Sequence, residues 1–193
     1  MIFLHGTCTY RSAQGKSITL LGCREGLWGE AAGSLVRVLR QISKLQCVLY
    51  IGKVGSMAKG FAANEWIATG NESFMDGSRI SWKDPIREAA KVSDLAVRGS
   101  HVSVPSPLCE TKEWLRQWQK TSSWVDCESG HMAKAALDEG IQFGYLHIVS
   151  DNLADEVNEN LSNEDCVPIQ MKRETLYRGI EAILREFITT WGT

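Results

Sequence analysis

The sequence predicts an α/β fold with a mixed, largely parallel central sheet flanked by helices. Apolar segments of strand length alternate along the chain with amphipathic segments of helix length, which is typical of strand–helix–strand units. The run 47–52 (CVLYIG) is apolar throughout and ends in glycine, as expected of a strand buried on both faces. The 193 residues are 44% hydrophobic and 23% charged, a composition that suits one folded domain over residues 1–193.

Each element is predicted from its own local pattern. Apolar residues at helical spacing, from Ala32 to Ile42, predict an amphipathic helix over 29–43. Residues 71–93 are polar and contain Pro85, so we expect a loop with one short helix there. The other strands are expected at 2–10, 17–22, 65–70, 95–104, 122–129 and 143–151, and the other helices at 109–119, 130–140 and 172–188.

Charge, hydropathy and cysteine usage exclude several classes of protein. The net charge is −2 and no basic stretch occurs, which argues against binding to nucleic acid. No apolar run approaches the roughly 20 residues that span a bilayer, and the start of the chain does not resemble a signal peptide. The six cysteines include no C-x-x-C pair, so we expect free thiols and a cytoplasmic protein.

Three familiar motifs are incomplete in this sequence. Residues 15–17 (GKS) resemble the end of a phosphate-binding loop, but Tyr10 stands where that motif needs glycine. No G-x-S-x-G sequence marks a hydrolase nucleophile. His5 and Cys8 are a lone pair without further ligands, so no metal site is expected. The remaining histidines are interpreted as structural, and they are His101, His131 and His147.

Carboxylates follow two of the predicted strands and are the first candidates for a site. Strand 122–129 ends in Asp126-Cys127-Glu128, and strand 143–151 ends in Ser150-Asp151. Charged groups at the ends of apolar strands are costly unless water, a partner or a ligand satisfies them. Ligands of open α/β sheets bind at the carboxyl ends of strands. The alternative is structural: Glu128 would face a helix dipole and Asp151 would cap the next segment.

Two stretches resemble the nucleoside phosphorylase superfamily, which includes purine nucleoside phosphorylases, uridine phosphorylases and methylthioadenosine/S-adenosylhomocysteine nucleosidases. Residues 48–60 (VLYIGKVGSMAKG) are similar to its buried strand and Gly-Ser phosphate loop. Residues 125–152 (VDCESGHMAKAALDEGIQFGYLHIVSDN) resemble its V-E-M-E-A helix start and its later S-D strand end. Residues 6–26 resemble the hairpin before its first long helix. The resemblance runs in order over nearly the whole chain and implies that superfamily's three-layer fold.

The resemblance also implies a function, which is cleavage of the N-glycosidic bond of a purine-type nucleoside by phosphate or by water. Its residues are carried over by position. Catalysis is assigned to Asp151, as the acid that protonates the leaving base, and to Arg173, as its assistant; ribose binding to Glu128 and Cys127; phosphate binding to Lys53, Gly55 and Ser56; base binding to Ser103, Pro107 and Asp126. No cofactor is implied, and inorganic phosphate is a possible co-substrate.

The sequence also departs from the superfamily pattern. The superfamily's first strand–helix unit has no counterpart, and that unit supplies phosphate contacts in phosphorylases and the water-activating glutamate in nucleosidases. Pro107 stands near the position of the aromatic residue that stacks on the base. Arg24 and Glu25 replace small residues beside the ribose, which indicates a charged substrate or an occluded site. The alternative function is therefore a non-catalytic nucleoside-binding or storage-type relative. A small-molecule nucleoside and a homo-oligomer are the expected partners.

Overall fold

The computed structural model describes residues 4–11, 17–23, 26–155 and 166–191. The strands are β1 (Leu4–Arg11), β2 (Ser17–Cys23), β3 (Cys47–Ser56), β4 (Ile67–Thr69), β5 (Glu72–Met75), β6 (Ser78–Ser81), β7 (Ala96–Arg98), β8 (His101–Ser103), β9 (Trp124–Asp126) and β10 (Gln142–Asn152). The helices are α1 (Glu30–Ile42), α2 (Lys112–Trp118), α3 (Ser129–Asp138) and α4 (Val167–Thr190), with short 3₁₀ turns η1 (Ala89–Val92) and η2 (Pro107–Cys109).

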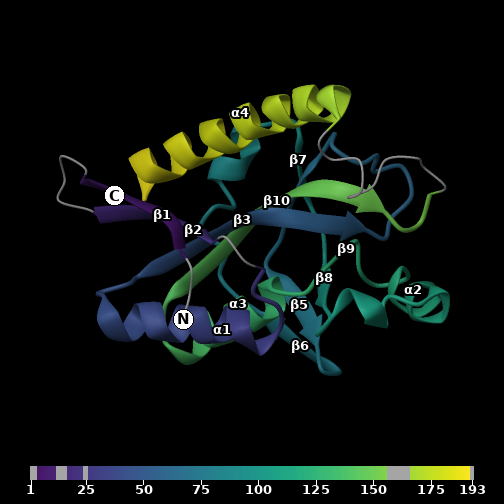
Figure 1. Cartoon of the computed structure of the whole chain (residues 1–193), viewed down its shortest axis with the longest axis horizontal. Helices are drawn as coiled ribbons and strands as arrows, with labels where there is room; N and C mark the ends of the chain where they lie inside the picture. Colours follow the sequence, from purple (N-terminus) through teal and green to yellow (C-terminus); the bar gives the residue numbers. More distant parts are fainter. Residues whose placement is uncertain (1–3, 12–16, 24–25, 156–165, 192–193) are drawn as a thin grey trace.

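Eight of the described strands form one mixed sheet in the order β6-β5-β8-β9-β3-β10-β4-β7. Four neighbouring pairs are parallel and three are antiparallel. Figure 1 shows α4 on one face of this sheet and α1 with α3 on the other. β1 and β2 pair only with each other, as an antiparallel hairpin. The predicted three-layer α/β architecture is confirmed.

The two halves of the core are divided by β10, which is buried on both of its faces. Phe143 and Tyr145 pack with α1 and α3, whereas Leu146 and Ile148 pack against α4. Side chains of a strand alternate between its two faces, so an apolar strand of this kind holds both layers to the sheet. β3 is its parallel neighbour, with ten aligned residue pairs and one irregularity between Val149 and Asp151. These two strands therefore form the rigid centre on which the candidate site is built.

The prediction of a loop over residues 71–93 is wrong, because β5 and β6 form a hairpin there. The hairpin turns at Asp76-Gly77, where φ is 51° and 73°. Both values are positive, as in the two-residue turns that join antiparallel strands, and Asp-Gly is a preferred pair for such turns. The turn residues lie between short strands with little apolar alternation, which is why hydropathy alone misses the hairpin. The short helix expected in this region is present as η1.

The single strand expected over 95–104 is in fact two strands, β7 and β8. β7 is at one end of the sheet beside β4, while β8 lies between β5 and β9. The chain crosses over at Gly99, where an added Cβ would stand 2.5 Å from Trp124 Nε1 and 2.7 Å from Ser123 Cβ. Only glycine allows this close approach to the segment before β9, so the strand breaks there.

The other predicted helices and strands are confirmed within about five residues at their ends. The prediction that the run 47–52 is buried on both faces is wrong, because these residues of β3 are half-buried and Ile51 is 41% exposed. α1 buries Ala32, Leu35 and Val36 as its apolar spacing predicts, although Ile42 at its last turn is 75% exposed. All six cysteines are free thiols. None of the helices in the described part of the chain has the length and apolar character needed to cross a membrane.

Candidate active site

The carboxylate-bearing strand ends meet at the end of β3. Gly55 of β3 is paired with Asp151 of β10 on one side and with Val125 of β9 on the other. β3 and β10 are parallel, as expected, but β9 runs antiparallel to β3. The expectation that all three ends share one carboxyl edge is therefore wrong for β9. Because β9 has only three residues, its end at Asp126 still lies beside the last residues of β3.

The carboxylate of Asp151 lies over the backbone of Gly55. Its Oδ2 atom is 3.4 Å from the point where a Cβ on residue 55 would stand, and Val125 Cγ1 and Leu153 Cδ1 are closer still, at 3.2 and 2.7 Å. Any larger residue at position 55 would displace these groups. Ser150 Oγ donates to Asp151 Oδ1 at 2.7 Å, so the serine orients the carboxylate. Gly55, expected in a phosphate loop, here makes room for Asp151.

Glu128 immediately precedes α3 and is half-buried. Its Oε2 accepts a hydrogen bond from the backbone N–H of Cys127 at 3.3 Å. Burial raises the pKa of Glu128 to about 7, and the negative charge of Asp126 adds to the effect. The neighbouring Cys127 thiol is buried, and burial with the charges of Glu128 and Asp126 raises its pKa to about 12. Glu128 is thus a carboxyl group that exchanges its proton near neutral pH, beside a thiol that stays protonated.

Two of the three residues expected to bind the base are hydrogen-bonded to each other inside the protein. Ser103 Oγ donates to Asp126 Oδ1 at 3.0 Å and accepts from the backbone N–H of Gly130 at 2.7 Å. Asp126 is 7% exposed. Pro107 lies apart from them, exposed at the first residue of η2. The base-binding role of these three residues stays a prediction, and the first two have a clear internal role.

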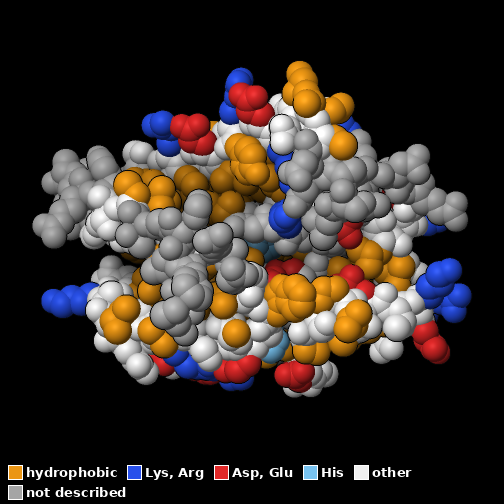
Figure 2. All heavy atoms as spheres, in the orientation of Figure 1, with side chains coloured by type: hydrophobic (Ala, Val, Ile, Leu, Met, Phe, Trp, Pro, Cys, Tyr) orange, Lys and Arg blue, Asp and Glu red, His pale blue; other side chains and the backbone are white. Residues whose placement is uncertain are grey.

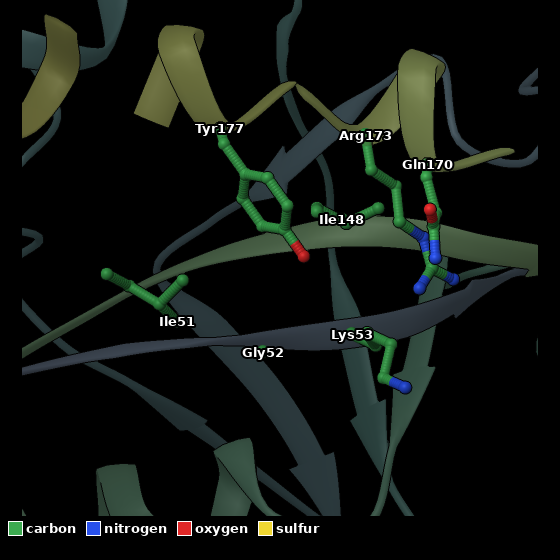
Figure 3. A pocket seen from close by; sticks show the side chains of 7 residues that line it. All are labelled: Ile51, Gly52, Lys53, Ile148, Gln170, Arg173 and Tyr177. Carbon is green, nitrogen blue, oxygen red and sulfur yellow. The ribbon is translucent and has the colours of Figure 1, made fainter. Parts of the chain in front are cut away.

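The residues expected to bind phosphate are also separated. The Ser56 hydroxyl is buried, where it donates to Ala58 O at 3.0 Å and accepts from Ala58 N at 3.2 Å. Lys53 instead lines a cavity of about 560 Å³ between β3, β10 and α4. Figure 3 shows Arg173, Gln170 and Tyr177 pointing from α4 towards β3, where Lys53 and Gly52 lie. The structure therefore brings Lys53 together with Arg173, and Ser56 is turned to a local contact.

Arg173 is joined to the end of β10 through one residue. The side chain is 8% exposed, and its Nε donates to Asn64 Oδ1 at 2.7 Å. The backbone N–H of Asn64 donates in turn to Val149 O at 2.6 Å, two residues before Asp151. Asn64 has a φ of 61°, an unusual backbone conformation for a residue with a side chain. Arg173 thus holds the loop beside the end of β10, and its assistance to Asp151 stays a prediction.

Sequence reasoning missed a fourth carboxyl group, Glu110. This half-buried residue ends the η2 turn, in the segment that leaves the sheet where Val104 N donates to Asp126 O at 2.9 Å. Burial raises the pKa of Glu110 to about 7, and the charges of Asp151 and Asp126 contribute. No motif marks Glu110, because it belongs to a loop whose position depends on the whole sheet.

The space-filling view shows where acidic groups reach this face of the molecule. Acidic side chains are visible in a hollow between the layer of α4 and the layer of α1 and α3 (Figure 2). Among the described residues, no group of three or more His, Cys, Asp and Glu side chains is arranged to hold a metal ion. Arg24 and Glu25, expected beside the ribose, lie outside the described residues.

Comparisons with solved structures place this arrangement among known folds. The chain superimposes on a futalosine hydrolase mutant of Helicobacter pylori with a TM-score of 0.72 and 17% identity, covering 96% of this chain and 88% of that one. It has the fold of a nucleosidase. Helicobacter pylori methylthioadenosine/S-adenosylhomocysteine nucleosidase superimposes with a TM-score of 0.70 and 15% identity, covering 97% of this chain and 87% of that one. The same enzyme of Colwellia psychrerythraea, in complex with adenine, superimposes with a TM-score of 0.67 and 15% identity, covering 96% of this chain and 87% of that one.

The likeness is one of structure, with little left in the sequence. No protein-family model matches this sequence, and no curated protein matches it significantly. At identities of 15–17%, most side chains differ although the arrangement of strands is shared. The nucleosidase fold is therefore established, and the function has to be argued from the site.

Proposed function

We propose that the protein hydrolyses the N-glycosidic bond of a purine-type nucleoside. The observation that carries the proposal is the convergence of β10, which carries Asp151, and β9, which leads into Glu128, on the last residues of β3, in a fold shared with hydrolases named as nucleosidases. This reaction requires two groups: a carboxylate that accepts hydrogen bonds from two ribose hydroxyls, and an acid that protonates the leaving base.

Each proposed role follows from the chemistry of bond cleavage. As the C–N bond breaks, positive charge develops on the sugar, as in other glycosyl transfers. Ionised Glu128 accepts hydrogen bonds from the ribose hydroxyls, which strengthen as that charge grows. Asp151, oriented by Ser150, donates a proton to a ring nitrogen of the departing base. The oxygen of a water molecule forms the new bond to the anomeric carbon, and the water's proton passes to a base.

The placement of the phosphate candidates favours water over phosphate as the attacking group. Ser56 makes both of its hydroxyl hydrogen bonds with Ala58, and Lys53 lines the cavity under α4. A phosphate bound by the Ser56 hydroxyl would require that hydroxyl to give up its hydrogen bonds with Ala58. Hydrolysis needs only a positioned water and a group that takes its proton.

We assign that proton-accepting role to Glu110. Its segment leaves the sheet at Val104, whose N–H donates to Asp126 O, and the charges of Asp151 and Asp126 act on the Glu110 carboxyl. Its pKa of about 7 suits a base at neutral pH, since proton transfer is most effective when the pKa is near the working pH.

The products of the reaction test the proposal. We expect pure protein to release free base and free ribose sugar from 5′-methylthioadenosine or another purine nucleoside, at a rate independent of added inorganic phosphate. Chromatography of a panel of nucleosides with and without phosphate measures this. Phosphate-dependent release of a sugar 1-phosphate would show phosphorolysis. Binding of nucleosides with no turnover of any of them would show a non-catalytic relative.

The role of Glu110 predicts a change in pH dependence. Each group that must be ionised adds one to the slope of log kcat/KM below its pKa, and the pKa values of Glu110 and Glu128 are both about 7. Glu110→Gln is expected to reduce kcat/KM about 100-fold and to lower the slope below pH 7 by one. Glu113→Gln, a matched change in the first turn of α2, is expected to keep both the rate and the slope. An unchanged slope in Glu110→Gln would remove the residue from the mechanism.

A further inference from the structure

A buried polar network lies between the sheet and α3, directly behind Glu128. Its first branch joins Ser73, His101 and Asp126: Ser73 Oγ is 2.9 Å from His101 Nδ1, and His101 Nε2 is 3.0 Å from Asp126 Oδ1. The side chains of Ser73 and His101 are fully buried. This order of groups is that of a hydrolase triad, but a serine sealed from solvent cannot reach a substrate, so the branch acts on Asp126.

The second branch joins His147, Ser129 and the other oxygen of Asp126. Ser129 Oγ donates to Asp126 Oδ2 in a short hydrogen bond. Because the serine has one proton and gives it to Asp126, His147 Nε2, which is 2.7 Å from Ser129 Oγ, is the donor in their contact. His147 is fully buried, and burial lowers its pKa against the opposing effect of Asp126. The ring is therefore neutral at pH 7, with its proton on Nε2.

Asp126 also anchors the backbone on both sides of the turn into α3. Its Oδ1 accepts from the N–H groups of Glu128 and Ser129, each at 3.0 Å, and from Ser103 Oγ. Although burial opposes ionisation, His101 and His147 hold the pKa of Asp126 well below its usual range. A buried carboxylate costs several kcal/mol unless donors surround it, and here the donors come from β8, from the backbone of Glu128 and from the first residue of α3.

This set of donors exceeds what a helix cap needs. One side-chain acceptor at the start of a helix satisfies a cap, whereas Asp126 binds two backbone N–H groups, two serines and a histidine. The two tyrosines that face the network carry no charge at neutral pH: Tyr145 stacks on His147, with ring centroids 4.7 Å apart, Tyr50 meets its edge at 4.8 Å, and burial raises both phenol pKa values. Cys127 stays a thiol, and Glu110, with a pKa of about 7, is partly ionised. After burial, the charge of Asp126 is the cause that raises the pKa of Glu128.

We propose that Asp126, fixed by His101 and His147, is a positioning residue that holds Glu128 at the sugar and sets when Glu128 gains and loses its proton. The inference rests on the proposed function for the identity of the sugar, but the link between Asp126 and Glu128 is a property of the folded protein. Hydrogen bonds of three serines fix the two histidines and the first turn of α3; these serines are Ser73, Ser103 and Ser129.

The variant Asp126→Asn tests this link, because asparagine has the same shape without the charge. The side-chain carboxyl of Glu128 is followed by ¹³C NMR through a pH titration, and its signal is assigned by its loss in Glu128→Gln. We expect the midpoint of Glu128 to move from about 7 towards the ordinary 4.5, stopping short of it because burial, the larger cause, remains. Asp138→Asn, on the exposed side of the same helix, is expected to leave the midpoint in place. An unmoved midpoint in Asp126→Asn overturns the proposal.

This titration needs no substrate, so its failure is distinct from failure of the proposed function. In the kinetic arm, with 5′-methylthioadenosine as substrate, kcat/KM of Asp126→Asn is expected to fall about 10- to 100-fold, and the acid limb of its pH profile is expected to shift to lower pH with Glu128. A protein that does not cleave the nucleoside but shows the shifted titration retains the link and loses the hydrolase assignment.

A pair of changes at His101 keeps the proposal testable if Asp126→Asn does not fold. The amide of His101→Gln can still donate to Asp126, whereas His101→Leu fills the space without a donor. We expect the glutamine variant to stay within about threefold of the wild-type kcat/KM and the leucine variant to lose about tenfold or more. Equal activity of the two variants would mean that His101 only fills volume, and the proposal would be wrong.

Discussion

Asp151→Asn is expected to reduce kcat for nucleoside cleavage by about 100- to 10,000-fold, the range that a positioned general acid contributes. Asparagine keeps the shape of the side chain and can still accept the hydrogen bond that Ser150 Oγ gives to Oδ1 at 2.7 Å. It cannot deliver a proton to the leaving base. The substitution therefore removes the chemistry while it leaves the contacts with Gly55 and Ser150 in place.

The leaving group separates loss of the acid from general damage. A para-nitrophenyl riboside departs without needing a proton, so Asp151→Asn is expected to cleave it nearly as well as the wild type does if the site accepts it. Asp94→Asn, an exposed residue between η1 and β7, serves as the matched control with wild-type rates on both substrates. Cleavage of purine nucleosides by Asp151→Asn at the wild-type rate would show that Asp151 is not the acid.

Part of the fold and of the site follows from local sequence. The alternation of apolar and amphipathic segments gives the α/β class, and the apolar run 47–52 identifies β3 as a strand, although the strand buried on both faces is its neighbour β10. Asp151 and Glu128 are visible because each ends a short apolar strand, where a charged group needs an explanation. The convergence of β10 and β9 on Gly55 depends on β3 and β10 being parallel neighbours and on the pairing of β3 with β9.

Other features depend on contacts that local sequence does not encode. β5 and β6 are too short to show alternation, and only the Asp76-Gly77 turn signals them. The break between β7 and β8 exists because Gly99 passes close to Trp124, a residue 25 positions away in a different strand. The direction of β9 was missed because a three-residue strand carries no sign of its orientation.

The buried network shows the same limit most clearly. Its serines, histidines and aspartate are spread from Ser73 to His147, and they meet only after β5, β8, β9, β10 and α3 have packed. Read singly, His101 and His147 are structural histidines, which agrees with their complete burial. Their shared contact with one carboxylate is what gives them a proposed part in the function.

Glu128→Gln is expected to reduce kcat/KM about 100- to 1,000-fold, as does the loss of other preorganised groups that stabilise developing charge, and to make the protein more stable at pH 8. Folding raises the pKa of Glu128 from 4.5 to about 7. Between these values the folded state binds more protons than the unfolded state, so stability falls as pH rises through this window and then levels off. Glutamine has no charge to bury, and it is expected to recover up to about 3 kcal/mol at pH 8.

The size of this stability gain must itself depend on pH. Chemical denaturation of wild type and Glu128→Gln at pH 8, 6 and 4.5 measures it. The difference in unfolding free energy is expected to be largest at pH 8, smaller at pH 6 and close to zero at pH 4.5, where Glu128 is protonated in the folded state and half protonated in the unfolded state. Glu139→Gln at the end of α3 controls for the loss of one surface charge. A constant difference across pH would mean that folding does not raise the pKa of Glu128. The proposal that this site gives up stability in exchange for catalysis would then be wrong.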